Sequence, residues 1–141
     1  MKTERIWQSL SRSPEETACI IKSRIGCIAL PYVIHLNGEL GTGKTFISKK
    51  IGEIYGHYEM SSPTFNKVSI NVGEVKIIHC DFYHISDHER FYHSEIEEHI
   101  DEATIILTEW STVKLNINIP SFLLLLETVD INSRFLRFTS I

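Results

Sequence analysis

The segment Gly38-Glu39-Leu40-Gly41-Thr42-Gly43-Lys44-Thr45 constrains the fold of this chain more than any other feature. It fits the pattern of a phosphate-binding loop, in which glycines let consecutive backbone N–H groups face one anion. An apolar run, Tyr32–Leu36, precedes it, and apolar residues at helical spacing, Ile47, Ile51 and Ile54, follow it. Strand, loop and helix in this order are the context that the motif needs, so an ordinary glycine-rich turn is the weaker interpretation.

Each part of the loop has a predicted chemical role. The helix that begins near Lys44 directs the positive end of its dipole toward the phosphates. The Lys44 ammonium is expected to reach the β and γ phosphates, and the Thr45 hydroxyl is expected to bind Mg²⁺. The loop therefore predicts a site for a nucleoside triphosphate with its metal ion.

The remaining hydrophobic patterns predict the other elements of an α/β fold. Strands are expected at 5–10, 32–36, 67–72, 75–80, 103–108, 120–128 and 134–139, and helices after Ser13, from Lys44 and from within 86–89. This order favours one P-loop NTPase domain over residues 1–141, with a mostly parallel sheet, antiparallel additions and flanking helices.

Three helix boundaries have recognisable signals. Ser13 precedes Pro14, and Glu16 follows three residues later, which is typical of a helix start with a capping box. Apolar residues at spacings of three and four extend this helix face to Ile28. Gly56 is placed to end the helix after the loop. The third helix is expected to bury Tyr92, Ile96 and Ile100.

Two acidic residues stand where parallel strands are expected to end. Asp81 follows the predicted strand 75–80, and Glu109 follows the apolar run 103–108. The carboxyl ends of parallel strands gather on the side of the phosphate loop, where a carboxylate is needed to hold Mg²⁺ or to order water. We expect Glu109 to bind the metal, directly or through water, and Asp81 to orient the attacking water or the Mg²⁺ shell. The alternative is two solvated carboxylates at strand ends.

Other features carry weaker signals. Thr64, in Ser61-Ser62-Pro63-Thr64, is a candidate for a switch-like residue that senses the γ-phosphate, although Ser and Pro are also ordinary turn residues. Trp110 either stacks on the nucleotide or a partner, or packs in the core or at its rim. Five histidines at positions 79, 84, 88, 93 and 99 are interpreted mainly as surface or capping residues.

Composition excludes several classes of protein. A chain of 141 residues has room for one compact domain. Its longest purely apolar run, Phe122–Leu126, is far below the roughly 18–20 residues of a membrane span, and no secretory signal is visible. Three cysteines without CxxC spacing favour reduced thiols and a cytoplasmic location. No block of Lys and Arg indicates direct binding of nucleic acid.

With these residues assembled, the chain resembles the TsaE (YjeE) family, small bacterial P-loop ATPases of tRNA threonylcarbamoyladenosine (t6A) synthesis. The resemblance covers about residues 6–138. It is carried by motifs in the family's order: Pro14-Glu15-Glu16-Thr17, the phosphate loop, Ser62-Pro63-Thr64-Phe65, His79-Cys80-Asp81-Phe82-Tyr83 and Thr108-Glu109-Trp110. The combination is more specific than the loop alone.

The resemblance implies roles for individual residues. Thr17 would lie beside the adenine, Arg134 would lie near the nucleotide, Glu109 matches the metal-site acid together with Thr45, and Asp81 matches an aspartate needed for hydrolysis. The implied nucleotide-binding residues are Thr17, Glu39, Leu40, Gly41, Thr42, Gly43, Lys44, Thr45, Phe46 and Arg134, and the implied catalytic residues are Lys44, Asp81 and Glu109.

The implied activity is weak, Mg²⁺-dependent ATP hydrolysis that supports threonylcarbamoyl transfer to adenosine 37 of tRNA. A TsaD–TsaB-like complex would carry out the transfer, so tRNA would be met only through that complex, and the free chain is expected to be a monomer without membrane contact. Three positions differ from the family pattern: His84 stands where arginine commonly follows the tyrosine, Phe46 where a second hydroxyl residue often follows the threonine, and Ile70 where an aromatic residue is expected. The segment between Glu89 and Glu109 is also shorter than in the family pattern.

Two other function classes stay open. A small-molecule P-loop kinase usually carries an arginine-bearing lid, and Arg90 is the single arginine between Leu36 and Ile119. A scaffold that binds nucleotide without hydrolysis would not need both Asp81 and Glu109. Turnover of Mg-ATP, and phosphoryl transfer to a small metabolite, discriminate among the three.

Overall fold

A computed structural model describes residues 4–61, 63, 67–111 and 118–141. Seven strands and three α-helices make up its regular structure, with one 3₁₀-helix at Glu97–His99. In chain order they are β1 (Glu4–Ser11), α1 (Pro14–Ile25), β2 (Tyr32–Asn37), α2 (Lys44–Ile54), β3 (Val68–Asn71), β4 (Lys76–Asp81), α3 (His88–Glu95), β5 (Thr104–Glu109), β6 (Ser121–Thr128) and β7 (Arg134–Ser140).

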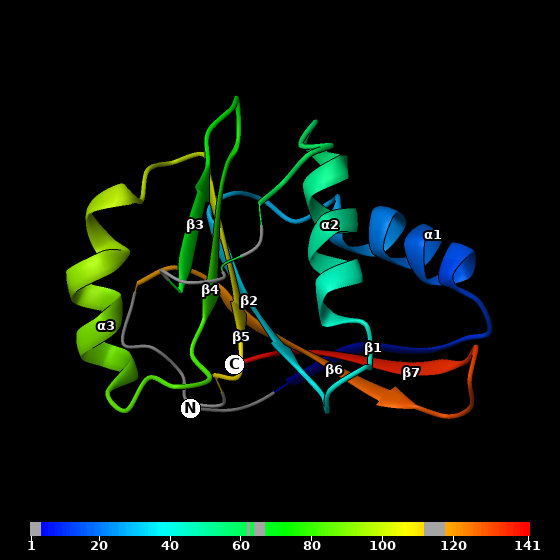
Figure 1. Ribbon diagram of the computed structural model, residues 1–141. Helices are drawn as coiled ribbons and strands as arrows, with labels where there is room; N and C mark the ends of the chain where they lie inside the picture. The colour runs from blue at the N-terminus through cyan, green and yellow to red at the C-terminus, as the bar shows by residue number, and fades with distance from the viewer. Residues whose placement is uncertain (1–3, 62, 64–66, 112–117) are drawn as a thin grey trace.

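The strands form one mixed sheet in the order β1-β7-β6-β2-β5-β4-β3. The four central strands β6, β2, β5 and β4 pair in parallel. At the two edges β3 pairs antiparallel with β4, and β7 pairs antiparallel with both β6 and β1. The predicted fold class, a mostly parallel sheet with antiparallel additions, is therefore confirmed (Figure 1).

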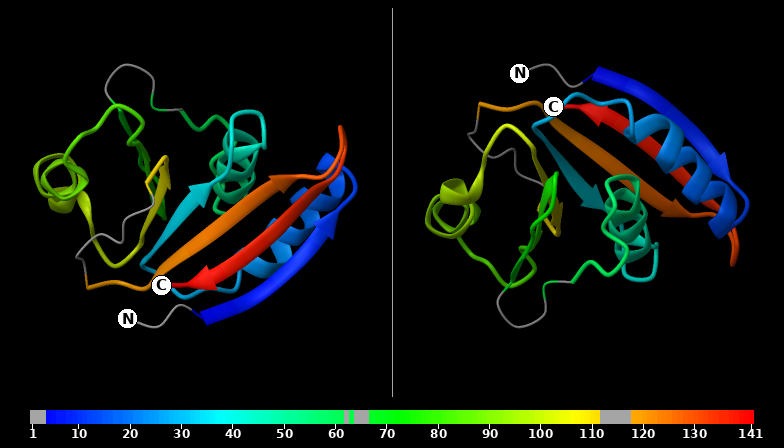
Figure 2. Two further views of the ribbon diagram at one scale, coloured as in Figure 1. Left: turned by 90° about the horizontal axis from the view of Figure 1, so that it is seen from below. Right: turned by 90° about the horizontal axis from the view of Figure 1, so that it is seen from above.

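Helices cover both faces of the sheet. The views in Figure 2 place α1 and α2 on one side of the sheet and α3 on the other. Side chains alternate accordingly: Ile34 and Ile105 join the core beneath α1 and α2, whereas Val33 and Ile106 join the core beneath α3. Because central strands are buried on both faces, they appear in the sequence as continuous apolar runs.

The predicted helix caps are largely confirmed. The Ser13 hydroxyl accepts from the Glu16 N–H at 3.0 Å, and Pro14 is the first residue of α1. The Glu16 carboxylate accepts from the Arg12 N–H at 3.3 Å, one residue earlier than a capping box requires. Gly56 has φ +87° and donates to the Glu53 carbonyl, which ends α2 as expected.

Two helix ends differ from the prediction. α1 ends at Ile25, so Ile28 packs against the core from the following loop. α3 ends at Glu95, and the chain turns through a 3₁₀-helix before Ile100. Glu97 still pairs with His93 one turn earlier, at 2.8 Å, and Ile96, the residue that follows α3, is fully buried. The predicted burial of Tyr92, Ile96 and Ile100 is confirmed, Ile100 being partly buried, but the prediction that one helix carries all three is wrong because α3 ends at Glu95.

Two observations concern the predicted cellular location of the protein. Cys19, Cys27 and Cys80 are free thiols, and Cys80 is buried. No helix among the described residues has the length and apolar character of a membrane span. The location that the sequence predicts stays a prediction.

A histidine is buried in the centre of the sheet. His35 of β2 is 1% exposed, and its Nδ1 shares a hydrogen bond with the Thr108 hydroxyl of β5. Its Nε2 has no partner among the residues that the structure describes. Burial, together with the nearby charge of His88, lowers the pKa of His35 from its ordinary 6.5 to about 4, so the ring is neutral at pH 7.

We predict that His35 makes the fold sensitive to acid. Because the folded-state pKa is depressed, the unfolded chain takes up this proton first, and the free energy of unfolding falls between about pH 6.5 and 4. The loss from this group is about 3 kcal/mol at full protonation. Urea unfolding of wild type and His35→Leu at pH 7 and pH 5 measures it: the variant should lose less stability than wild type. Equal losses in the two proteins would contradict the prediction.

Candidate functional site

The phosphate loop joins the end of β2 to the start of α2, as predicted. A Cβ atom at Gly38 would lie 2.7 Å from the Leu126 carbonyl oxygen and from the Thr42 hydroxyl, so the loop passes close to β6 only because residue 38 is glycine. Gly43, with φ +104°, caps α2 without a side chain. The first N–H groups of α2 are thereby left for a ligand, which is the arrangement of an anion site.

The Lys44 ammonium lies inside this loop. Its Nζ donates to the carbonyl oxygens of Gly38 at 2.5 Å and of Glu39 at 3.0 Å, and it lies 4.2 Å from the ring centroid of Trp110. Burial lowers the pKa of Lys44 below its ordinary value, and the negative charges of Glu109 and Asp81 oppose that effect. A partly desolvated ammonium whose partners in the described part of the chain are two carbonyls and a π face is a favourable partner for phosphate oxygens.

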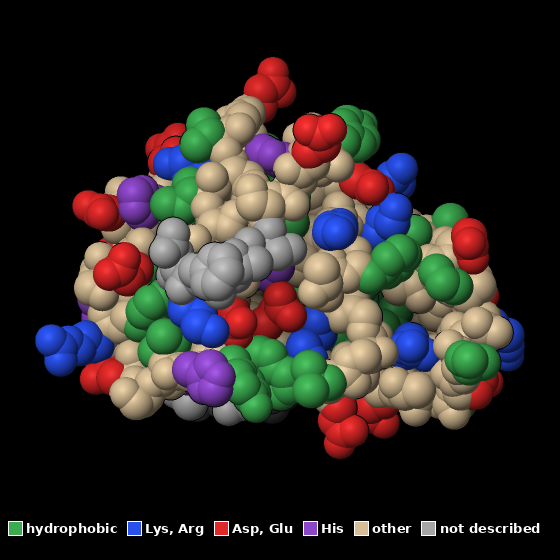
Figure 3. All heavy atoms as spheres, viewed as in Figure 1, with side chains coloured by type: hydrophobic (Ala, Val, Ile, Leu, Met, Phe, Trp, Pro, Cys, Tyr) green, Lys and Arg blue, Asp and Glu red, His purple; other side chains and the backbone are tan. Residues whose placement is uncertain are grey.

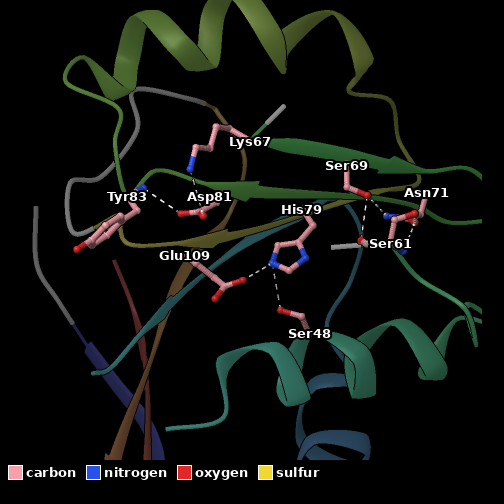
Figure 4. A network of polar contacts seen from close by, with 9 residues as sticks. All are labelled: Ser48, Ser61, Lys67, Ser69, Asn71, His79, Asp81, Tyr83 and Glu109. Carbon is pink, nitrogen blue, oxygen red and sulfur yellow. Dashed lines mark hydrogen bonds and ion pairs between the residues drawn. The ribbon is translucent and has the colours of Figure 1, made fainter. Parts of the chain in front are cut away.

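The two acidic residues lie side by side at the same edge of the sheet. Asp81 and Glu109 are register partners at the carboxyl ends of β4 and β5. The Asp81 carboxylate accepts from the Tyr83 N–H at 2.9 Å and lies 3.8 Å from the Lys67 Nζ (Figure 4). The Asp81 side chain is 24% exposed and the Glu109 side chain is 13% exposed, so neither is a fully solvated strand-end carboxylate.

Glu109 has a partner that the sequence interpretation missed. The Nε2 of His79 lies 2.6 Å from the Glu109 Oε2, and His79 is 1% exposed (Figure 4). The interpretation of His79 as a surface or capping histidine is therefore wrong. The available signal was its spacing: His79 lies two residues before Asp81 on one strand, so the two share a face.

Lys67 was also missed. It has φ +63° and lies just after the segment 61–66, and its carbonyl accepts from the Asp81 N–H at 2.8 Å. No sequence pattern marks this contact, because it depends on how β3 pairs with β4. Thr64, the predicted switch-like residue, lies outside the described residues.

A cavity of about 280 Å³ lies against the loop, and several of the predicted phosphate-binding residues line it. Its lining consists of Leu40, Gly41, Gly43, Lys44, Thr45, Glu109 and Trp110. Around it, the space-filling view shows acidic and basic side chains together in the middle of this face, next to a group of hydrophobic side chains (Figure 3). Leu40 is 82% exposed, and Tyr83, whose ring lies 5.0 Å from the Trp110 ring at a tilt of 60°, is 56% exposed.

A second cavity, of about 200 Å³, adjoins the other side of the loop. Thr17, Phe46 and Arg134 line it together with Gly43 and Ile131. Thr17 and Arg134, far apart in the sequence, are therefore brought to one place beside the loop. Phe46 contributes an apolar surface there, as a base-binding cavity requires.

Arg134 fastens the loop to the C-terminal hairpin. Its Nε donates to the Thr42 carbonyl at 3.0 Å and one terminal nitrogen lies 3.4 Å from the Gly41 carbonyl. The other terminal nitrogen donates to the carbonyls of Asp130 and Ser133. This side chain thus supports the loop in addition to lining the cavity.

The residues present fit a magnesium–nucleotide complex. Thr45 and Glu109 offer a hydroxyl and a carboxylate at one cavity, and Mg²⁺ prefers oxygen ligands supplied by one or two protein groups together with phosphates. The Lys44 ammonium and the open backbone of the loop match phosphate oxygens.

Comparison with known proteins agrees with this geometry. The model of the family described as "Threonylcarbamoyl adenosine biosynthesis protein TsaE" matches residues 3–134. The chain belongs to the TsaE family. A relative from Rickettsia bellii, named tRNA threonylcarbamoyladenosine biosynthesis protein TsaE, is 30% identical over 137 residues, 94% of each chain. A Bacillus subtilis protein of the same name is 30% identical over 107 residues, which are 74% of this chain and 65% of the relative.

A solved structure shares the fold. The crystal structure of Bacillus subtilis YdiB superposes with a TM-score of 0.70 over 100% of this chain and 88% of that chain, at 22% sequence identity. Membership of the family confirms the resemblance seen in the sequence, and the solved structure supports the same fold. The roles of individual residues stay predictions.

We predict that Arg134→Lys loosens the phosphate loop. Lysine cannot reproduce the planar set of donors that holds four backbone carbonyls, and the lost bonds correspond to about 1–2 kcal/mol. Amide hydrogen exchange of residues 41–43 should accelerate by about tenfold. Arg137→Lys, on the same strand, is the matched control and should leave this exchange unchanged. Unaltered exchange in Arg134→Lys would show that the loop does not depend on the guanidinium.

Proposed function

We propose that this chain binds Mg²⁺–ATP and hydrolyses it slowly, and that this cycle supports threonylcarbamoyl transfer to adenosine 37 of tRNA by a TsaD–TsaB-like partner complex. The names of the family and of its relatives support the pathway. The arrangement of Lys44, Thr45, Asp81 and Glu109 around one cavity edge supports the chemistry. That arrangement is the observation on which the proposal rests.

Binding would use the loop and its two cavities. The Lys44 ammonium would leave its carbonyl partners for the β and γ phosphate oxygens, while the N–H groups at the start of α2 hold the phosphates. The base would enter the cavity lined by Thr17, Phe46 and Arg134. Thr45 and Glu109 would hold the metal ion, which neutralises charge on the β and γ phosphates when bound.

Hydrolysis would require an oriented water. Asp81 lies beside Glu109 and is fixed by the Tyr83 N–H, which leaves a carboxylate oxygen to accept a hydrogen bond from water. The water oxygen would form the new bond to the γ phosphorus as the bond from this phosphorus to the β–γ bridging oxygen breaks, and the water proton would pass to the Asp81 carboxylate and from there to solvent. Lys44 would stabilise the charge that develops on the phosphates.

The transfer itself would belong to the partner. Leu40 and Tyr83 expose apolar surface at the rim of the phosphate cavity. A partner bound to this surface would contact residues next to the bound nucleotide. We infer that the partner accelerates turnover there, that tRNA is contacted through the partner, and that the free chain is a monomer.

The first test separates binding from hydrolysis. Lys44→Ala should abolish measurable Mg-ATP binding by calorimetry. Asp81→Asn should retain binding and lower the single-turnover rate by about 100-fold, since it removes an acceptor for the water. Asp101→Asn, at an exposed carboxylate before β5, is the matched control. A wild-type rate in Asp81→Asn would remove the proposed role of that residue, and binding without any wild-type turnover would favour a nucleotide-dependent scaffold.

The second test concerns the pathway. The TsaD–TsaB pair of the same organism, unmodified tRNA and threonylcarbamoyl donor should give multiple rounds of t6A formation with the wild-type chain, measured by nucleoside mass spectrometry. Lys44→Ala should reduce the yield to that obtained without the chain. A yield that is independent of the chain would refute the assignment.

A further inference from the structure

The buried histidine of β4 raises a question that the fold alone does not answer. His79 sits on the sheet face that packs against α2, 1% exposed, where its neighbours on the strand, Ile77 and Ile78, are apolar. Its Nδ1 has no hydrogen-bond partner in the described part of the chain. A buried polar atom without a partner costs about 1–3 kcal/mol, so an apolar residue would suit the core better.

The contacts of the His79 Nε2 atom indicate a role for this residue at the site. It lies 2.6 Å from the Glu109 Oε2 and 3.5 Å from the Ser48 hydroxyl of α2. An ionised carboxylate accepts hydrogen bonds and cannot donate, so the proton belongs on Nε2 in this contact. The imidazole therefore donates a short bond to the carboxylate at the point where β5 reaches the phosphate cavity.

The alternative position for the Glu109 carboxylate is Lys44. Glu109 is among the negative groups whose charge acts on the Lys44 ammonium, and both residues line the phosphate cavity. A direct ion pair between them would occupy the ammonium needed for phosphates and the carboxylate needed for the metal. Among the described residues, however, the hydrogen bond of the Glu109 side chain is to His79, and the Lys44 ammonium binds carbonyl oxygens of the loop.

We propose that His79 is a positioning residue: its Nε2–H fixes one oxygen of Glu109, which holds the carboxylate apart from Lys44 and leaves the other oxygen for the metal-ion shell. The inference rests on the proposed function, since it deepens the role of the same site. Groups that orient a metal-binding side chain from behind commonly change metal affinity by about 10- to 100-fold when removed.

The test measures metal affinity apart from catalysis. Mn²⁺ binding to the whole chain saturated with the non-hydrolysable analogue AMP-PNP is followed by the EPR signal of free Mn²⁺, and analogue binding in EDTA is measured by calorimetry. His79→Leu should weaken Mn²⁺ binding by about 10- to 100-fold and leave metal-free analogue binding unchanged. His79→Gln, whose amide nitrogen can stand in for Nε2, should restore most of the affinity, whereas His79→Asn, whose amide is one carbon nearer the backbone, should not.

His35→Leu is the matched control. His35 is as buried as His79 and also lies two residues before the end of a central strand, β2, but on the opposite face of the sheet. Its ring forms a hydrogen bond with Thr108 rather than with Glu109. Its Mn²⁺ affinity should equal that of wild type. If His79→Leu does not fold by circular dichroism, the comparison of His79→Gln with His79→Asn decides the question alone.

Other results would overturn the inference in distinguishable ways. Wild-type Mn²⁺ affinity in His79→Leu or His79→Asn would exclude a positioning role. Equal losses in His79→Gln and the other His79 variants would mean that packing of the imidazole matters and its hydrogen bond does not. A wild-type protein that binds neither the analogue nor Mn²⁺ would instead refute the proposed function.

Discussion

The parallel pairing of β2 with β5, and of β5 with β4, is the constraint on which the candidate site depends. Parallel strands bring their carboxyl ends to one edge, and the register sets His35 opposite Thr108 and Asp81 opposite Glu109. The phosphate loop leaves β2 at the same edge. A shift of one residue in the β2–β5 pairing would turn Glu109 toward α3 and away from Lys44, and the same shift in the β5–β4 pairing would turn Asp81.

Among the described residues, the Lys44 ammonium forms no ion pair with Asp81 or Glu109, although both carboxylates lie at the same edge. The Lys44 ammonium is bound by loop carbonyls and covered by Trp110, while Asp81 is held by a backbone N–H with Lys67 at 3.8 Å. A phosphate ligand can displace the loop carbonyls from the Lys44 ammonium, whereas it can leave the hydrogen bond between the Tyr83 N–H and the Asp81 carboxylate in place. Preorganised charges of this kind act strongly on phosphate chemistry, since little rearrangement is needed when the ligand arrives.

Sequence patterns predicted those parts of the molecule that local rules determine. The loop, the caps at Ser13 and Gly56, and the strand-end positions of Asp81 and Glu109 each follow from spacing or from a residue's backbone preference. The end of α3 was missed because Glu95 is followed by Ile96 rather than by a glycine or asparagine stop signal, and the apolar spacing continues to Ile100. The contacts of His79 and Lys67 were missed because they join different strands, and pairing between strands is a long-range property that one segment does not encode.

The two buried histidines share one origin. His35 and His79 each lie two or fewer residues from the end of a central strand, on opposite faces of the sheet, so the apolar core stops short of the edge on both sides. Each leaves a ring nitrogen without a partner in the described structure, at a cost in stability. A core designed only for stability would continue with isoleucine or leucine to the last strand residue. His35 and His79 cost stability because they are buried. The same burial keeps their rings from turning away, so that they can hold side chains at the edge of the sheet in fixed positions.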